Sequence, residues 1–226
     1  MTGALVSIQI GRAQTYRLWS EDGAETARRT GFGKTPTLFP VRVFRTHIEG
    51  DEQANLKFHG GIDAPILAYC AEHYPRWQAE LGTPGMGPGA FGENFTISGL
   101  SGAIDETTVC IGDRFRIGDL IAEVSQPREP CSTLTSWWKM PELARLVVER
   151  NRGGWYLRVI EEGTVKTGDA VERIAQPYPQ WTIAAAMRTR LHGKRTDPQT
   201  RNLYDCPALS TRWKIHMAKR LGETMQ

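Results

Sequence analysis

The most constraining feature of this sequence is a series of short apolar runs separated by turn residues. Gly112-Asp113 and Gly118-Asp119 divide the segment from 109 to 124 into short stretches. Short runs that are rich in β-branched residues and bounded by Gly and Asp predict strands rather than helices. Such signals recur at close intervals through the middle of the chain. We therefore expect a mostly β (α+β) fold, built as a barrel rather than as an open α/β sheet.

One segment in this β region carries reactive chemistry, and it reads Ser125-Gln126-Pro127-Arg128-Glu129-Pro130-Cys131. It follows an apolar run, and its two prolines fix φ and withhold two N–H groups from a ladder. We expect a stiff loop at a strand end that presents Cys131. Arg128 would lower the pKa of the thiol and favour the thiolate, which attacks electrophiles and binds soft metals. The alternative is a buried structural cysteine beside a surface arginine.

Length and composition exclude several classes of protein. A chain of 226 residues forms one large domain, or one domain with a small appendage. A net charge of +3 is too small for a polycation that seeks nucleic acid. No apolar run is long enough to cross a bilayer, and the N-terminus lacks the pattern of a secretory signal. The four cysteines form no CxxC pair, which argues against structural zinc and disulfides and favours a cytoplasmic location.

Two glycine-containing segments could bind an anion. Gly31 and Gly33 precede Lys34, so the backbone there could approach a ligand while the lysine grips a phosphate. In His59-Gly60-Gly61, the glycines could turn N–H groups towards an anion and the imidazole adds a tunable donor. Each segment also has a simpler interpretation, a surface turn with a solvated lysine in the first and a tight turn in the second.

A third polar site stands at the junction of a loop and a strand, where Glu93 and Asn94 lie between apolar residues. An asparagine there offers donors and an acceptor that suit the edge of a heterocycle. The alternative is a turn residue that bonds to its own backbone.

The remaining pattern gives a coarse secondary structure. We expect strands near 5–10 and 40–44, a polar loop over 20–30, a helix over 64–81 and helical structure over 134–150. The composition changes at Gln176-Pro177-Tyr178-Pro179. This predicts a β-barrel domain over residues 1–176 and a small helical segment over residues 177–226.

The segment 177–226 is basic and shows no DNA-reading signature. A solvated face or a surface that docks a partner is therefore the preferred interpretation. If it docks a donor, a chain ending near Gln176 should stay folded and keep its ligand, yet lose turnover driven by that donor. If it covers an apolar patch, truncation should cause loss of fold.

Five motifs, taken together in this order, are similar to those of a known family: Gly50-Asp51-Glu52-Gln53, His59-Gly60-Gly61, Phe91-Gly92-Glu93-Asn94-Phe95, Gly112-Asp113 and Ser125 to Cys131. Over about residues 5–175 the chain resembles the MOSC domain, the C-terminal domain of molybdenum-cofactor sulfurase. The branch it resembles is that of the bacterial 6-N-hydroxylaminopurine resistance proteins, which carry a small three-helix tail. Asn55 is a departure, because many relatives have an acid there, and any catalytic role of that position is in doubt.

The resemblance implies a MOSC-like β-barrel with flanking helices that binds a molybdenum cofactor (molybdopterin). Cys131 matches the cysteine that ligates molybdenum, and it would be both the metal ligand and the catalytic residue. The cofactor-binding residues would be Lys34, His59, Gly60, Gly61, Glu93, Asn94 and Arg128. No bound flavin, haem or NAD site is expected, since no GxGxxG follows a strand.

The implied activity is that of an oxidoreductase that reduces small N-hydroxylated compounds, such as N-hydroxylated base analogues, in detoxification. Electrons would come from a separate donor protein, a flavin or iron–sulfur reductase. No membrane and no specific nucleic acid is expected as a partner, and a homodimer is compatible with the sequence. Two alternatives stay open, a carrier that holds sulfur as a persulfide on Cys131 and a cofactor-binding protein without turnover.

Overall fold

The computed structural model of the chain describes residues 1–20, 22–54 and 60–223. Its strands are β1 (Thr2–Ile10), β2 (Gln14–Trp19), β3 (Glu25–Thr30), β4 (Thr35–Pro36), β5 (Val41–Val43), β6 (Ile66–Cys70), β7 (Phe95–Gly99), β8 (Arg114–Ile117), β9 (Leu120–Pro127), β10 (Trp155–Glu161), β11 (Gly163–Val165) and β12 (Ala170–Ala175). Its helices are α1 (His73–Leu81), α2 (Ser132–Trp138), α3 (Leu143–Glu149), α4 (Ile183–His192), α5 (Pro198–Tyr204) and α6 (Thr211–Leu221).

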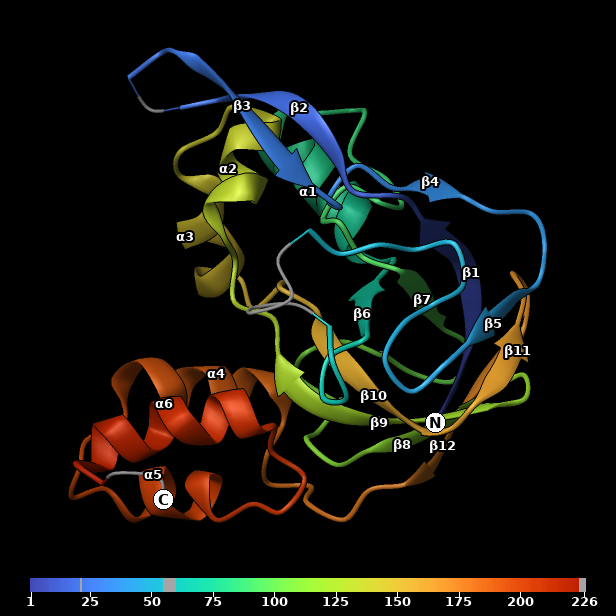
Figure 1. Cartoon of the computed structure of the whole chain (residues 1–226). Helices are drawn as coiled ribbons and strands as arrows, with labels where there is room; N and C mark the ends of the chain where they lie inside the picture. The colour runs from blue at the N-terminus through green and yellow to red at the C-terminus, as the bar shows by residue number, and fades with distance from the viewer. Residues whose placement is uncertain (21, 55–59, 224–226) are drawn as a thin grey trace.

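A closed barrel forms the centre of the molecule (Figure 1). Its strands follow the order β12-β8-β9-β10-β6-β7-β1, and β1 pairs back with β12 to close the sheet. The closing pair is antiparallel, with Thr2 opposite Glu172, whereas β6 and β7 run parallel. The sequence-based expectation of a mostly β barrel with flanking helices and a small helical tail is confirmed.

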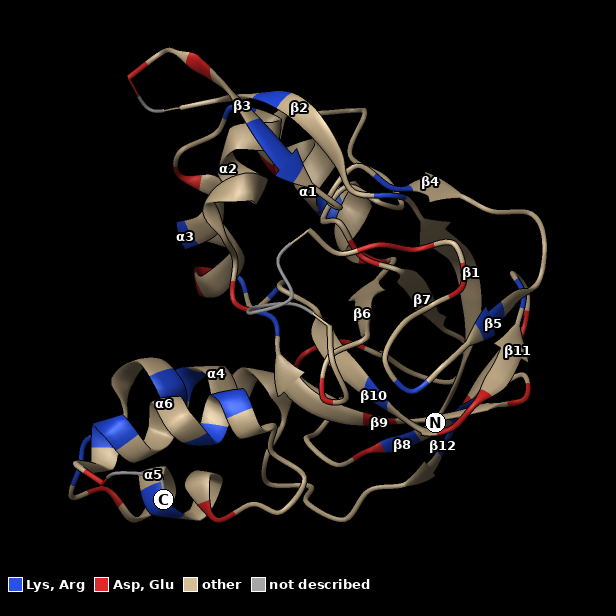
Figure 2. Cartoon of the chain, in the orientation of Figure 1, with Lys and Arg blue, Asp and Glu red and all other residues tan. Residues whose placement is uncertain are grey.

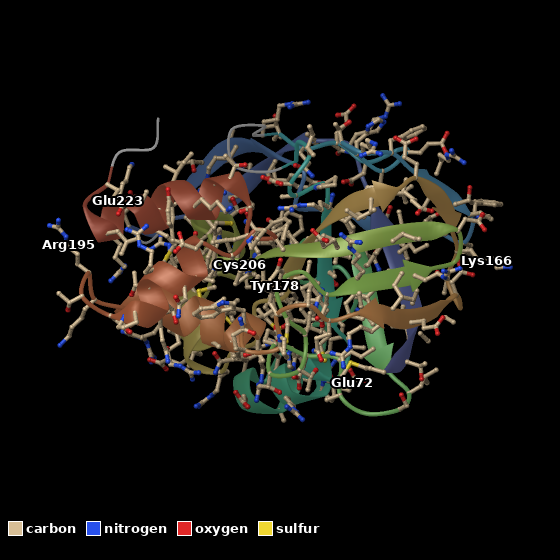
Figure 3. The ribbon with its side chains drawn as sticks, turned by 90° about the horizontal axis from the view of Figure 1, so that it is seen from below. Glu72, Lys166, Tyr178, Arg195, Cys206 and Glu223 are labelled. Atoms are coloured by element: carbon tan, nitrogen blue, oxygen red, sulfur yellow. The ribbon has the colours of Figure 1, made fainter. Side chains whose placement is uncertain are left out.

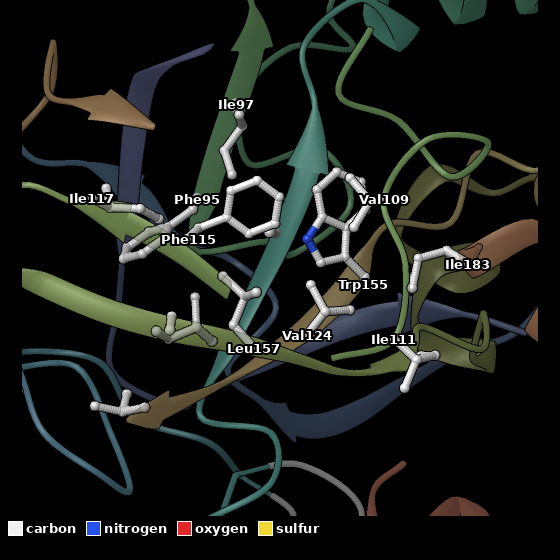
Figure 4. Packing of buried hydrophobic residues seen from close by; sticks show 14 of the residues in the cluster. Phe95, Ile97, Val109, Ile111, Phe115, Ile117, Val124, Trp155, Leu157 and Ile183 are labelled. Atoms are coloured by element: carbon white, nitrogen blue, oxygen red, sulfur yellow. The ribbon is translucent and has the colours of Figure 1, made fainter. Parts of the chain in front are cut away.

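The barrel encloses a dense apolar core (Figure 4). Phe95, Trp155 and Leu157 are fully buried there. Burying one such side chain stabilises the folded state by about 1.5–3 kcal/mol. Closure leaves these strands without a free edge, so the barrel is a rigid frame for the loops at its ends.

A second apolar cluster lies outside the barrel, where α1, α2 and α3 meet. It joins Trp77 of α1 and Leu134 of α2 to Tyr69 and Phe91, whose rings stack at 4.4 Å. The hairpin β2–β3 packs on α2, since the ring of Tyr16 meets Trp137 edge to face at 5.0 Å. This cluster therefore holds α2, which follows Cys131, against the barrel.

The predicted helix over 64–81 is wrong in its first half. Residues 66–70 form the strand β6, and the helix α1 starts only at His73. All five residues of β6 are buried between β10 and β7. A fully buried strand has no alternation, so its apolar run cannot be told from a buried helix. Pro75 then falls in the first turn of α1, where a proline is tolerated.

Two further expectations need correction. The polar segment 20–30, expected as a loop, contains β3, which pairs with β2 from Glu25 to Thr30. The helical stretch 134–150 is split into α2 and α3, because Lys139 ends α2 in the left-handed conformation and Pro141 follows.

The three C-terminal helices α4, α5 and α6 pack against the end of the barrel. One continuous core cluster contains the barrel residue Val124 together with Ile183 of α4 (Figure 4). Trp213 of α6 belongs to the same cluster. Seen from below, Tyr178 and Cys206 lie near this junction (Figure 3). At Gly112, whose φ is +82°, a Cβ would come within 2.7 Å of the Tyr178 ring, so the tail needs glycine in that turn.

Among the described residues, no helix is long and apolar enough to cross a membrane. The division of the chain at residue 176 into two domains stays a prediction.

Candidate functional site

A cavity of about 590 Å³ opens at one end of the barrel. It is lined by residues from the β3–β4 segment, the loops at 52–54 and 91–94, the Cys131 segment, the strands β6 and β10, and α6. Segments far apart in the sequence therefore meet at this end, including one from the tail.

A β-bulge shapes the wall that leads to Cys131. Between β10 and β9, Tyr156 pairs with Gln126 and the next residue, Leu157, pairs with Val124, so Ser125 is the extra residue. A bulge bends its strand and re-aims the side chains around it. Here Val124 stays in the barrel core, while Gln126 and Tyr156 line the cavity.

Cys131 stands where the sequence predicts it, in a loop after a strand. It is the N-cap residue of α2 and lines the cavity, half-buried. Burial would raise the pKa of its thiol, but the charge of Arg128 and hydrogen bonds from Leu134 and Thr133 outweigh burial and lower it. The site therefore favours the thiolate, a nucleophile and a soft metal ligand.

Arg128 is buried, contrary to the alternative of a surface arginine. It is 3 % exposed, its Nη2 donates to the Phe91 carbonyl oxygen at 3.3 Å, and its backbone N–H donates to Gly154 at 3.0 Å. Within the described part of the chain, its Nη1 is buried without a hydrogen-bond partner. A buried guanidinium N–H without a partner can donate to an anionic oxygen that comes within reach.

Lys34 and Asn94 line the cavity but already have protein partners. Lys34 forms a buried ion pair with Asp51. The Asn94 amide donates to the Gln9 carbonyl oxygen at 3.2 Å and to Asp51 at 3.0 Å. Its Oδ1 accepts from the Leu67 N–H at 3.1 Å. These bonds hold the loops that carry Lys34 and Asn94 in place. They also reduce the number of hydrogen bonds that either side chain can form with a ligand.

Glu93 does not line the cavity among the described residues. Its carboxylate accepts hydrogen bonds from the Tyr74 hydroxyl, the Gly89 N–H, the Phe91 N–H at 3.0 Å and the Thr96 hydroxyl at 3.2 Å. It therefore holds the loop that carries Phe91, whose carbonyl oxygen accepts a hydrogen bond from Arg128. In this structure Glu93 thus helps to position Arg128.

The predicted His59-Gly60-Gly61 site is only partly described. His59 and the divergent Asn55 lie outside the described residues. Gly60 and Gly61 have φ of +84° and +69°, which allows the turn that the sequence predicts, but neither lines the cavity. The roles predicted for Lys34, Gly60, Gly61, Glu93, Asn94, Arg128 and Cys131 stay predictions.

Sequence reasoning missed several cavity residues that come from distant elements. Tyr156 lies on β10 and is 6 % exposed, and burial raises the pKa of its phenol to about 12. Arg28 reaches from β3 to the Ser136 hydroxyl at 2.5 Å, and Arg212 comes from α6. The ladder register of Tyr156 opposite Gln126 is a long-range pairing, so no local signal marks it.

Comparison with known proteins agrees with this architecture. The model of the MOSC domain family matches residues 55–172, and that of the YiiM-like, 3-alpha helix domain matches residues 181–223. The uncharacterized protein YflK of Bacillus subtilis is 35% identical, over 96% of this chain and 94% of YflK. A protein of Gibberella moniliformis named reductase is 33% identical over 82% of this chain, but the match spans only 32% of that protein.

The fold is also similar to a solved structure. The crystal structure of YiiM from Geobacillus stearothermophilus has a TM-score of 0.77 and 30% identity, and it covers 97% of this chain and 99% of that one. The likeness extends through both the barrel and the three C-terminal helices. The chain therefore belongs to the MOSC family and carries the YiiM-like three-helix domain after its barrel.

Proposed function

We propose that this protein is a molybdenum-cofactor-dependent reductase of N-hydroxylated compounds, such as N-hydroxylated base analogues, and that it acts in their detoxification. The observation that carries the proposal is Cys131, a thiol of lowered pKa that lines a cavity of about 590 Å³ beside the buried Arg128. MOSC domains are associated with molybdenum-cofactor binding, and a thiolate is a soft ligand of the kind that such a metal centre takes.

The residues present fit this cofactor. The cavity volume lies within the range of about 300–1,000 Å³ that small-molecule and cofactor sites occupy. Cys131 would supply the sulfur ligand from the protein. Arg128 Nη1 has no hydrogen-bond partner among the described residues, so it would donate a hydrogen bond to an anionic group of the cofactor. Lys34 and Asn94 would contribute from the cavity mouth, and Asp51 offsets part of the lysine charge.

When bound, the molybdenum cofactor supplies the two-electron chemistry that converts an N-hydroxyl group to an amine and water. The overall change is R–NHOH + 2 e⁻ + 2 H⁺ → R–NH2 + H2O. The chain itself binds the substrate, orients it and holds a proton near it. Tyr156 lines the cavity, and its phenol, whose pKa is about 12, keeps its proton at neutral pH.

The electrons would come from a separate protein, a flavin or iron–sulfur reductase, in the cytoplasm. The sequence has no dinucleotide-binding fingerprint of its own.

The first test measures molybdenum in the natively purified protein together with turnover of an N-hydroxylated base. Cys131→Ser should lose molybdenum and activity with little change in melting temperature, because a serine hydroxyl replaces a half-buried thiol that supports no core packing. Cys110→Ser is the matched control, since Cys110 is buried and does not line the cavity. A serine variant that keeps metal and turnover would disprove the assignment.

A sulfur carrier is the second candidate, and the partial exposure of the low-pKa thiol favours it. In that case the protein would hold no molybdenum, and the Cys131 thiolate would attack the outer sulfur of a donor persulfide, release the donor as a thiol, and pass that sulfur on to an acceptor thiolate. A protein that keeps molybdenum but shows no turnover with any electron donor would instead be a cofactor-binding protein.

A further inference from the structure

A buried carboxylate outside the main cavity joins three parts of the molecule. Glu106 lies in a turn between β7 and β8 and is 2 % exposed. Its Oε2 lies 2.7 Å from Nε2 of His73, the first residue of α1, and its Oε1 accepts a hydrogen bond from the Gly154 N–H at 2.6 Å. Its backbone carbonyl oxygen accepts from the N–H of Ala184, in the first turn of α4, at 2.8 Å. One residue therefore links α1, the segment before β10 and the tail.

The contact with Gly154 leads to the loop that carries the reactive thiol. The Gly154 carbonyl oxygen accepts a hydrogen bond from the Arg128 N–H at 3.0 Å. A Cβ on Gly153 would come within 2.9 Å of the Arg128 carbonyl oxygen, and a Cβ on Gly154 within 2.4 Å of the Ala68 carbonyl oxygen. The backbone at 153–154 therefore fits between Arg128 and β6 without room for a side chain, and its position fixes that of the Arg128 backbone.

Glu106 and Arg128 also line a second, much smaller cavity of about 20 Å³, together with residues of α3 and α4. They are the two charged residues in its described lining, and both are buried. Water screens opposite charges little in such a place, and a buried guanidinium is costly without a carboxylate near it. Glu106 therefore supports Arg128 through its charge as well as through Gly154.

His73 orients the carboxylate. The imidazole is buried, and its ring meets that of Tyr69 edge to face at 5.5 Å. Among the described residues, its Nδ1 has no hydrogen-bond partner, so Nε2 is the nitrogen through which it contacts the protein's polar groups. A carboxylate whose two oxygens have different buried partners is fixed in one orientation. The imidazole thus keeps Glu106 Oε1 aimed at the Gly154 N–H.

We propose that Glu106, oriented by His73, is a positioning residue that holds Arg128 beside Cys131. It does not line the larger cavity among the described residues, so it acts through Gly154 and Arg128 rather than on a ligand. The proposal deepens the proposed function, and it rests on that function only where it concerns retention of the cofactor.

The direct test measures how fast iodoacetamide alkylates Cys131 at pH 7 in cofactor-free, full-length protein. In Glu106→Ala, Arg128 loses its support, and alkylation should slow by up to about tenfold, the change that the loss of one neighbouring charge produces. In Glu106→Gln, the amide can accept from the Gly154 N–H and donate to His73 Nε2, so the rate should stay near that of the wild type. Equal rates in Glu106→Ala and the wild type, or equal slowing in both variants, would overturn the proposal.

Tyr69→Phe is the matched control. It removes a buried hydroxyl that donates to the Arg152 carbonyl oxygen at 3.2 Å, two residues before Gly154, but it leaves the bond between Glu106 and Gly154. Circular dichroism should show a lower melting temperature, while the alkylation rate of Cys131 stays at the wild-type value. Slowing as large as in Glu106→Ala would mean that any weakening of this segment affects the thiol, and the specific role of Glu106 would be rejected.

If Glu106→Ala does not fold, His73→Phe decides. Phenylalanine keeps a ring against Tyr69 but has no nitrogen to hold the carboxylate of Glu106. The Arg128 amide should then exchange hydrogen faster, and Cys131 should be alkylated more slowly than in the wild type. If either rate is unchanged in the folded variant, the positioning role is wrong.

This proposal and the proposed function fail in different ways. Slow alkylation in Glu106→Ala, in a protein that never retains molybdenum, would keep the positioning role and reject the reductase. Equal alkylation rates, in a protein whose molybdenum content and turnover depend on Cys131, would keep the reductase and reject the positioning role.

Discussion

At the scale of single residues, the site depends on Arg128 and Cys131, which are neighbours in the sequence, and on contacts from distant segments that bury Arg128. The proximity of Arg128 to Cys131 is predictable from sequence because three residues separate them in a proline-bracketed loop. The burial of Arg128 is not predictable in this way. It depends on Phe91 and Gly154, which approach from a different loop and from the start of β10.

The pair predicts a pH profile. The folded protein holds the pKa of Cys131 below its ordinary value, so thiolate is present at lower pH than in the unfolded chain. Removing the charge in Arg128→Ala should raise that pKa and slow alkylation of Cys131 by iodoacetamide at pH 7 roughly tenfold, the effect of one pKa unit. Arg128→Lys keeps a point charge and should slow it less.

The measurement is the alkylation rate of cofactor-free protein between pH 5 and pH 9, followed by mass spectrometry of the peptide that contains Cys131. Circular dichroism of each variant separates a change in pKa from a change in fold. Superimposable profiles for wild type and Arg128→Ala would show that burial and helix hydrogen bonds alone set the thiol pKa.

For Glu93 and Asn94, the sequence locates the polar site, but it does not reveal the role of each residue. The loop-to-strand junction marks the position correctly, because polar residues between apolar ones need partners. Those partners lie up to 85 residues away, as with Asn94 and the Gln9 carbonyl oxygen. Only the folded chain shows that Glu93 supports a loop while Asn94 lines the cavity.

At the scale of elements, sequence pattern succeeds where one face of a strand is buried and fails where both faces are. β1 alternates and was expected, whereas the continuous apolar run of β6 is equally compatible with a helix. The hairpin β2–β3 was missed for another reason. Its residues are mostly polar and exposed, so it depends on packing against α2 rather than on its own pattern.

This dependence predicts local unfolding of the hairpin when its support is removed. Trp137 contacts Tyr16 at 5.0 Å and Phe32 at 5.1 Å, between ring centroids. In Trp137→Ala, the amides of β2 and β3 should exchange hydrogen faster while those of β9 keep their protection, because the barrel does not rest on this contact.

Lys139→Ala provides the contrast for hydrogen exchange. It removes only an exposed ion pair with Glu25 at 3.1 Å, which water and salt screen, so the hairpin should stay protected. Uniformly faster exchange in both the hairpin and the barrel of Trp137→Ala would mean that the two unfold as one unit.

At the scale of the whole molecule, charge is divided unevenly along the chain. Residues 177–226 contain nine Lys or Arg and three Asp or Glu, a net charge of +6, although the complete chain carries only +3. Lys and Arg residues are prominent on α4 and α6 (Figure 2). A basic surface raises the encounter rate with an acidic donor protein, and salt screens this attraction.

We therefore expect the double variant Arg188→Ala, Lys219→Ala to slow donor-driven turnover at low salt. Both side chains are exposed and lie outside the cavity lining. Turnover with a small artificial reductant should be unchanged, because it needs no docking. If the double variant and the wild type turn over at the same rate with either reductant at every salt concentration, the tail does not dock the donor.

The same tail is also part of the apolar core, and this alters the expected result of truncation. Ile183, Trp213 and Met217 are buried in the cluster that contains barrel residues such as Val124. A chain ending at Gln176 would expose this end of the core to water. The sequence leaves two roles open for residues 177–226, docking a donor protein or covering an apolar patch. The structure favours the second role.

Truncation at Gln176 should therefore lower the melting temperature sharply or cause aggregation, and it should release the proposed cofactor because Ser210 no longer fixes the bulged end of β9. Trp213→Ala in the full chain tests the same coupling more gently. Loss of this fully buried ring should destabilise the fold by about 3–5 kcal/mol. Since one core links tail and barrel, chemical denaturation of this variant should show a single transition. Two separate transitions, with the barrel unfolding at the wild-type midpoint, would show instead that the tail is an independent domain.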